Sequence, residues 1–274
     1  MPNPDNSDSP ITLLSYGRSG TSLTMSIMRA HPDVLACGET GQMIFGVWQA
    51  MERVRGVIRP DPVLGGTEAH DARCGKAVRA VFEATFPDEG QPRWFQKPIN
   101  TSATFRQAMS GRSAQKKGDW YWNVLNTCFP NGQTLTILRH PYDVVLSSAE
   151  YWKADPAGSW EAIVGMAELI LHERSTIDFA LSHRRLVEEP QAEIARLLTH
   201  VGLSHHPRCF KATEKVYVPE RKVNRVPKDQ MQDHVARGFS RRDEWHKLDT
   251  AKFKDSDRET LVRMWARFGE TLEF

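Results

Sequence analysis

The 274-residue sequence predicts an α/β fold, a central parallel sheet flanked by helices. Two observations support this class. A short apolar run followed by a tight turn and a helical pattern occurs near the start of the chain and again in its middle, and amphipathic segments fill the intervals. No internal repeat or low-complexity linker divides the sequence. We therefore expect a flexible N-terminal tail over residues 1–10 and a single domain over residues 11–274.

The first strand, loop and helix are expected at the start of the predicted domain. Ile11–Ser15 is a short apolar run, and Gly17 follows it closely. Thr21–Ala30 then carries apolar residues at helical spacing. This order predicts a strand that turns tightly into a helix.

A second unit of the same kind lies in the middle of the chain. Phe95 precedes Lys97 at the end of one short apolar run, and Thr134–Leu138 forms another. Pro141 suits the first turn of a helix, where its missing N–H costs nothing, and the apolar pattern continues to Ser148. A cationic residue therefore follows each of these runs, Lys97 the first and Arg139 the second.

The remaining segments read mainly as helices that cover the sheet. Residues 101–118 are polar and are expected to be irregular or mobile beside the site. Amphipathic spacing predicts helices over Gly41–Glu52, Thr67–Phe86, Trp160–Leu181 and Pro190–Val201.

Composition and charge exclude several classes of protein. With 40% apolar residues the chain can bury a substantial core, which excludes disorder, collagen and coiled coil as descriptions of the whole. The net charge of +2 indicates no bias toward nucleic acid, and no apolar stretch approaches the roughly 20 residues of a membrane span. The polar start lacks the features of a secretory signal, so a cytoplasmic location is expected.

The cysteines do not suggest a metal centre or a disulfide framework. They are widely scattered, with no CxxC pair and no Cys/His cluster at metal-ligand spacing. Free structural thiols and no metal site are therefore expected. The four are Cys37, Cys74, Cys128 and Cys209.

The predicted turn after the first strand has the character of a phosphate-binding loop. It places Gly, hydroxyl side chains and one Arg at a helix N-terminus, where backbone N–H groups can bind an anion. A Walker A loop requires GxxxxGK[ST], but Thr21 occupies the lysine position and Ser15 the first glycine position. Such a loop can still hold a phosphate without Mg²⁺, because a guanidinium supplies charge and a forked set of donors. The candidate ligands are Arg18, Ser19, Gly20, Thr21 and Ser22.

Two motifs resemble those of sulfotransferases that use 3′-phosphoadenosine 5′-phosphosulfate (PAPS). The run from Tyr16 to Leu23, YGRSGTSL, is similar to their 5′-phosphosulfate loop. The following segment, residues 28–40, resembles that of tyrosylprotein sulfotransferases and related bacterial enzymes. Residues 136–147, TILRHPYDVVLS, resemble the 3′-phosphate motif, in which Arg139 and Ser147 would bind one phosphate. At 3.6 residues per turn, the eight-residue offset turns by about 80° net, so both side chains can face one group.

Weaker similarities extend toward the C-terminus. Leu186–Pro190 resembles an L-x-x-x-P segment of the family, with His183 to Arg185 where Tyr-Glu-Asp is usual. Residues 221–224 resemble a basic segment that helps to hold the nucleotide, so Lys222 is a possible contact.

The resemblance implies a sulfotransferase with PAPS as sulfuryl donor and adenosine 3′,5′-bisphosphate (PAP) as product. Arg18 and Lys97 would neutralise charge on the donor, and Glu39 would take the proton of the acceptor hydroxyl. His70 and His140 are rival bases.

Several alternatives stay open at this stage. The acceptor is a hydroxyl compound, which can be a small metabolite, a glycan or a tyrosyl peptide. A degenerate P-loop-like kinase and a non-catalytic nucleotide-binding module are competing interpretations. The missing Walker lysine counts against the kinase, and the pair of Lys97 with Glu39 counts against the module. Metal-independent activity is expected.

Overall fold

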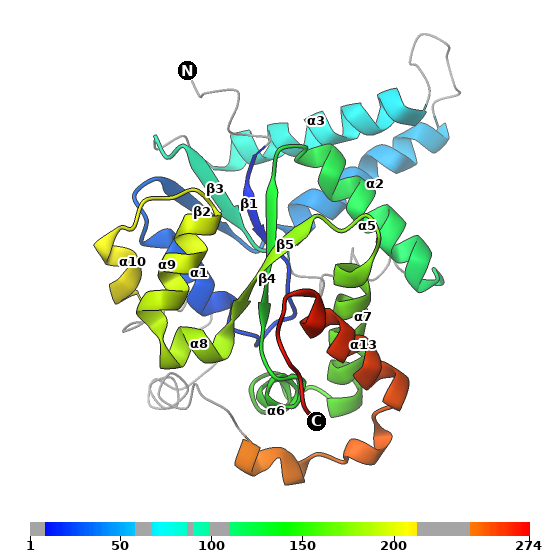
Figure 1. Cartoon of the computed structure of the whole chain (residues 1–274). Coiled ribbons are helices and arrows are strands. Elements are labelled where there is room, and N and C mark those ends of the chain that lie inside the picture. The colour runs from blue at the N-terminus through cyan, green and yellow to red at the C-terminus, as the bar shows by residue number, and fades with distance from the viewer. Residues whose placement is uncertain (1–8, 58–66, 87–89, 99–109, 213–241) are drawn as a thin grey trace. The chain divides into compact units, whose positions relative to one another are not determined.

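A five-stranded sheet organises the chain (Figure 1). The computed structural model describes residues 9–57, 67–86, 90–98, 110–212 and 242–274. The strand order is β2-β3-β1-β4-β5, and β1 pairs in parallel with both β3 and β4, as β2 does with β3. The predicted α/β class with a central parallel sheet is confirmed. The strands are β1 (Ile11–Leu13), β2 (Val34–Gly38), β3 (Arg93–Gln96), β4 (Gln133–Leu138) and β5 (Ile177–Ser182).

Helices occupy most of the chain between and after the strands. None of them, within the described part of the chain, is long and apolar enough to cross a membrane. The helices are α1 (Thr21–Arg29), α2 (Gly41–Val57), α3 (Thr67–Thr85), α5 (Ala114–Cys128), α6 (Pro141–Trp152), α7 (Pro156–Leu171), α8 (His183–Glu188), α9 (Pro190–His200), α10 (Pro207–Lys211) and α13 (Asp255–Arg267), with 3₁₀ turns η2 (Arg242–Lys247) and η3 (Thr250–Lys252).

The described residues form two compact units, each assembled from separated stretches of chain. The first unit contains the chain up to Leu14, together with Pro32–Leu135 and Glu168–Asp178. The second unit contains Ser15–His31, Thr136–Ala167 and Phe179–Phe274. The single domain over residues 11–274 stays a prediction.

Several large aromatic side chains are buried in the core of the first unit. Phe45 and Trp48 of α2, Phe82 of α3, and Tyr121 and Trp122 of α5 are all essentially inaccessible to solvent. Each of these helices therefore buries one apolar face. The predicted helices over 41–52 and 67–86 are confirmed, although α2 continues to Val57.

The helix predicted over Trp160–Leu181 is wrong in its second half. Helix α7 ends at Leu171, and Ile177–Ser182 is strand β5. Five of the six residues of β5 are buried, so its apolar residues also fit a helical spacing continued from α7. Periodicity alone cannot separate a short buried strand from a buried helix.

Two further differences concern segments with weak local signals. Strand β2 is not expected from the sequence, and it forms by pairing with β3, from Val34 opposite Arg93 onward. The irregular segment predicted over 101–118 is wrong from Ala114, where α5 begins. The Ser113 hydroxyl accepts a bond from the Lys116 N–H and so caps this helix. Residues 101–109 lie outside the described residues.

The four cysteines are free, as expected. Cys74, Cys128 and Cys209 are buried, and Cys37 is partly buried. Burial raises the pKa of Cys37 to about 12 and that of Cys209 to about 11. These thiols therefore stay protonated at neutral pH and are weak nucleophiles.

Candidate functional site

The loop between β1 and α1 is held in shape by its own hydroxyl groups. Ser19 Oγ donates to the Tyr16 carbonyl at 2.6 Å and lies 2.8 Å from Ser15 Oγ. Within the second unit, Ser15 Oγ also donates to the carbonyl of Ile137 in β4 at 3.2 Å. Ser19 and Thr21 are buried, whereas Ser22 is exposed. The loop is therefore preorganised by Ser15 and by Ser19, of which Ser19 is a predicted cofactor ligand.

The backbone of this loop has the conformation of an anion-binding concavity. Arg18 has a φ of 69° and Gly20 a φ of 109°, so two left-handed residues precede α1. Alternation of this kind turns successive N–H groups toward one point. Gly20 is the N-cap of α1 and makes no side-chain capping bond, which leaves the first-turn N–H groups of α1 for a ligand.

Arg18, Arg139 and Ser147 form one contiguous group in the second unit. Arg139, which follows the end of β4, donates through Nη1 to the Arg18 carbonyl at 2.8 Å. Arg18 donates through Nε to Ser147 Oγ on α6 at 3.2 Å. Two guanidinium groups and a hydroxyl therefore lie around the same loop. Their donor set suits a phosphate, because Arg offers a forked set of N–H groups.

The Arg18 guanidinium is partly buried. Burial lowers the pKa of this group, and electrostatic interactions with Tyr151 and Glu150 of α6 oppose that effect. The guanidinium carbon lies 4.1 Å from the centre of the Tyr151 ring. A cation that is partly removed from water gains more from a bound anion than an exposed cation does.

His183 is a loop neighbour that sequence reasoning did not assign to the site. A Cβ atom on Gly20 would lie 2.8 Å from His183 Cδ2 and 2.8 Å from Ile137 Cδ1, so the loop fits against this ring only as glycine. Burial, and next the charge of Arg139, lower the pKa of His183 to about 3. The imidazole is therefore neutral at physiological pH. The sequence indicated His183 only indirectly, because this residue lies in the segment where the family usually has Tyr-Glu-Asp.

Glu39 and Lys97 are an ion pair in the first unit. Lys97 Nζ lies 3.4 Å from Glu39 Oε1, with 8% of the Lys97 side chain and 48% of the Glu39 side chain exposed. The two residues follow the ends of β2 and β3, which pair in parallel, and the Lys97 N–H donates to the Gly38 carbonyl at 3.0 Å. Parallel pairing thus brings these two predicted residues together. The Glu39 carboxylate is thus held beside the buried Lys97 ammonium.

A buried polar chain supports this pair. Thr40 donates through Oγ1 to Gln96 Oε1 at 3.1 Å, and Gln96 Nε2 donates to Thr12 Oγ1 at 3.0 Å. Thr40 and Gln96 are fully buried. Thr40 follows Glu39 in the sequence, and Gln96 precedes Lys97. These hydrogen bonds therefore fix the backbone that carries the ion pair.

His140 serves the structure of α6. Its Nδ1 accepts the N–H of Tyr142 at 3.3 Å, and its Nε2 lies 2.8 Å from the Glu273 carbonyl. The ring also stacks on Trp245 at 4.0 Å. With Nδ1 accepting, Nε2 carries the proton and donates it to the carbonyl, so the neutral ring has no lone pair left for a base.

His70 and Lys222 are the two remaining residues that the sequence analysis predicts for the site. His70 lies on α3, and its Nε2 is buried with no hydrogen-bond partner among the described residues. Lys222 lies outside the described residues.

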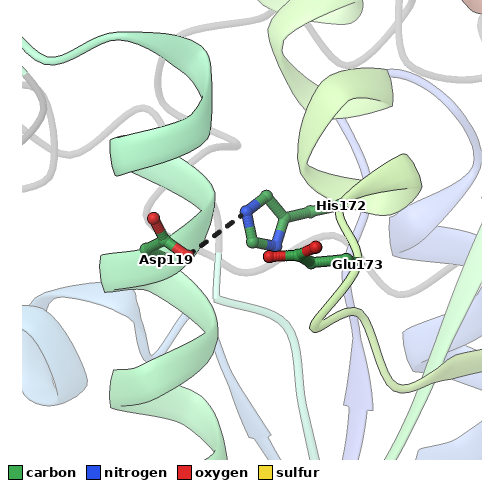
Figure 2. A group of neighbouring side chains, drawn as sticks. All are labelled: Asp119, His172 and Glu173. Carbon is green, nitrogen blue, oxygen red and sulfur yellow. Dashed lines mark ion pairs between the residues drawn. The ribbon is translucent and has the colours of Figure 1, made fainter.

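A cluster of possible metal ligands also lies in the first unit. Asp119 of α5 faces His172, with Glu173 next to the ring (Figure 2), and their ligand atoms lie within 4.8 Å of one another. The N–H of Arg174 donates to His172 Nδ1 at 3.2 Å, so the neutral ring carries its proton on Nε2, 3.6 Å from Asp119 Oδ1. Arg174 Nε lies 3.5 Å from the same carboxylate oxygen. The Asp119 carboxylate therefore already has a cationic neighbour in Arg174.

The fold and these side chains define an α/β protein whose loop between β1 and α1 lacks the lysine of nucleoside triphosphatases and offers donors that suit an anion. The family model described as "Sulfotransferase family" matches residues 10–207. The chain belongs to the sulfotransferase family. Nodulation protein NoeE of Sinorhizobium fredii (strain NBRC 101917 / NGR234) is 22% identical over 235 residues, which cover 74% of this chain and 52% of NoeE. The chain thus matches about half the length of that relative.

Solved structures agree on the fold. The sulfotransferase domain of the olefin synthase of Synechococcus PCC 7002 aligns with a TM-score of 0.56 and 14% identity, covering 100% of this chain and 99% of that domain. The sulfotransferase domain of the curacin biosynthetic pathway aligns with a TM-score of 0.54 and 13% identity, covering 97% and 99%. At these identities the likeness shows the sulfotransferase fold.

Proposed function

We propose that this chain is a PAPS-dependent sulfotransferase that transfers a sulfuryl group to a hydroxyl. The observation that carries the proposal is the group formed by Arg18, Arg139 and Ser147 around a loop whose helix N-terminus makes no side-chain capping bond. It combines two guanidinium groups, a hydroxyl and open N–H groups, and it has no Walker lysine. Membership of the sulfotransferase family supports the same reaction.

Each residue has a distinct task in the proposed reaction. The donor supplies an activated sulfuryl group, whose transfer is an in-line displacement that resembles phosphoryl transfer. Arg18 and the loop N–H groups hold the 5′-phosphate, and Arg139 with Ser147 holds the 3′-phosphate. Lys97 stabilises the negative charge that develops on the departing oxygen. Glu39 accepts the proton of the acceptor hydroxyl as its oxygen bonds to sulfur.

The donor assignment predicts a strong preference for a 3′-phosphate. PAP should bind much better than AMP or ATP, because those nucleotides lack the 3′-phosphate that Arg139 and Ser147 are proposed to bind. Loss of a charge-assisted bond costs about 1.5–3 kcal/mol, which is roughly 10- to 150-fold in affinity. Isothermal titration calorimetry measures this directly, and Arg139→Ala should erase the difference. Equal affinities for the three nucleotides in the native protein would contradict the proposal.

Activity should survive chelation. The sequence has no Walker lysine and no evident Walker B acid, so the charge on the donor is left to arginine and lysine rather than to Mg²⁺. Sulfuryl transfer measured with an excess of EDTA should match the untreated rate. Loss of activity with EDTA that Mg²⁺ restores would favour a kinase-like site instead.

A further inference from the structure

A cavity of about 250 Å³ lies in the first unit, at the end of the sheet where β4 begins. It is lined by Thr12 of β1, by Thr134 of β4 and by the C-terminal end of α5. Glu39 and Lys97, in contrast, follow the carboxyl ends of β2 and β3. Because β2, β3, β1 and β4 run parallel, the cavity lies toward the opposite edge of the sheet from that ion pair. The proposed sulfuryl transfer therefore makes no use of this space.

The lining of the cavity is polar but carries no charge. Leu125 and Phe129 contribute apolar surface, and none of the lining residues in the described chain is ionisable. A charged ligand would lose its water here without gaining a counter-charge, whereas a neutral molecule with a polar group meets matching partners. The polar side chains of the lining are Thr12, Asn126, Thr134 and Thr176.

Two threonine hydroxyls in the cavity have unused hydrogen-bonding capacity. Thr134 is 7% exposed, and its hydroxyl has no hydrogen-bond partner among the described residues. Thr12 lies opposite Thr134 in the parallel register, so the two side chains share one face of the sheet. Thr12 Oγ1 accepts a bond from Gln96 Nε2 at 3.0 Å, and its own hydrogen is left to donate. A buried hydroxyl without a partner costs free energy, so an acceptor atom of a ligand is stabilised between these two groups.

Thr12 also connects the cavity to the buried hydrogen-bond chain of Thr40, Gln96 and Thr12. Gln96 donates to Thr12 and accepts from Thr40, and these bonds fix the backbone that carries Glu39 and Lys97. A ligand oxygen that accepts the Thr12 hydrogen polarises the hydroxyl, and the Thr12 oxygen then becomes a better acceptor for Gln96. Occupation of the cavity therefore acts on the chain that positions the ion pair.

We propose that this cavity is a second ligand-binding site, for a small neutral molecule with a carbonyl or amide oxygen, and that its ligand strengthens the bond between Gln96 and Thr12. The ligand oxygen accepts from Thr12 and Thr134, and its apolar body lies against Leu125 and Phe129. A cavity of about 150 Å³ holds benzene, so about 250 Å³ accommodates a molecule of roughly ten non-hydrogen atoms. This site is independent of the proposed sulfuryl transfer, because the donor nucleotide takes no part in it.

A matched pair of probes tests the binding site. Cyclohexanecarboxamide and cyclohexanecarboxylate have the same number of non-hydrogen atoms, but the carboxylate is ionised at neutral pH. In titrations of isotope-labelled protein followed by NMR, the amide should bind the native protein at least about tenfold more tightly than the carboxylate. No binding of the amide, or equal binding of the two probes, would overturn the inference.

A hydroxyl deletion tests the contact with the ligand. Thr134→Val keeps the shape of the side chain and removes the hydroxyl, so it should weaken binding of the amide about three- to tenfold. Thr85→Val makes the same exchange at an exposed position on α3, away from the cavity lining, and should leave the affinity unchanged. Equal affinities of Thr134→Val and the native protein would contradict the proposed contact.

The link to the buried chain has its own readout. Both probes are saturated and cause no ring-current shifts, so the side-chain amide signal of Gln96 reports on its bond to Thr12. Saturating cyclohexanecarboxamide should move this signal in the native protein, and Thr12→Val, which removes the acceptor, should abolish the response. An unmoved Gln96 signal in the saturated native protein would overturn the link. Circular dichroism reports whether each variant folds, and the native protein with Thr134→Val decides the outcome if Thr12→Val does not. PAP binding enters none of these measurements, so their failure is distinct from a failure of the proposed function.

Discussion

Glu39→Gln is expected to lower kcat by about 10²- to 10⁴-fold, the usual contribution of a general base. Glutamine keeps the size of the side chain and removes its ability to take a proton. Glu39 is 48% exposed, so the amide can be hydrated, and the fold should tolerate the change. Nucleotide affinity should stay nearly unchanged, because the proposed nucleotide contacts are made by other residues. Steady-state kinetics together with PAP calorimetry separate the two effects.

The dependence on the acceptor provides an internal control for this prediction. Acidic phenols lose their proton more readily than alkyl or sugar hydroxyls, so the loss on Glu39→Gln should shrink as the pKa of the acceptor falls. Near-native turnover of an alkyl hydroxyl by Glu39→Gln would show that Glu39 is not the base. His70 would then be the next candidate, because both ring nitrogens of His140 are engaged in bonds that fix α6 and Glu273.

Lys97→Ala is expected to lower kcat by about 10²- to 10³-fold for every acceptor, which is the typical cost of losing one group that stabilises developing charge. The departing negative charge is common to all acceptors, so the factor should be the same for phenols and for alkyl alcohols. This uniform loss distinguishes Lys97 from Glu39. Rates for at least two acceptors of different pKa, measured at saturating donor, provide the comparison.

Lys97→Arg is the matched variant, since it keeps the positive charge and the partner of Glu39. It should retain more activity than Lys97→Ala, although the buried position, with 8% of the side chain exposed, limits how well the larger guanidinium fits. Circular dichroism and PAP affinity of both variants exclude a general loss of fold. A loss that differs strongly between acceptors would contradict a role on the donor side.

The sequence alone determined the features that depend on neighbouring residues. An apolar run followed by glycine and by helical spacing is a local pattern, so the first strand, the loop and the helix near Thr21–Ala30 were predicted within a few residues of β1 and α1. The family was also readable, because its two motifs are continuous segments. Arg139 and Ser147 lie in one such segment and were assigned together for that reason.

Only the tertiary structure decided which distant side chains meet and which conformation short buried segments take. Arg18 and Ser147 are 129 residues apart in the chain, and their bond exists because α6 packs beside the loop in the second unit. Glu39 and Lys97 meet because β2 pairs in parallel with β3, and β2 has too weak a local signal to be expected. Ile177–Ser182 became a strand although its residues suit a buried helix, because sheet pairing and burial outweigh local preference in segments this short. The contact between Trp152 and Gly17 depends in the same way on packing, since a glycine marks where a ring can approach without indicating which ring does so.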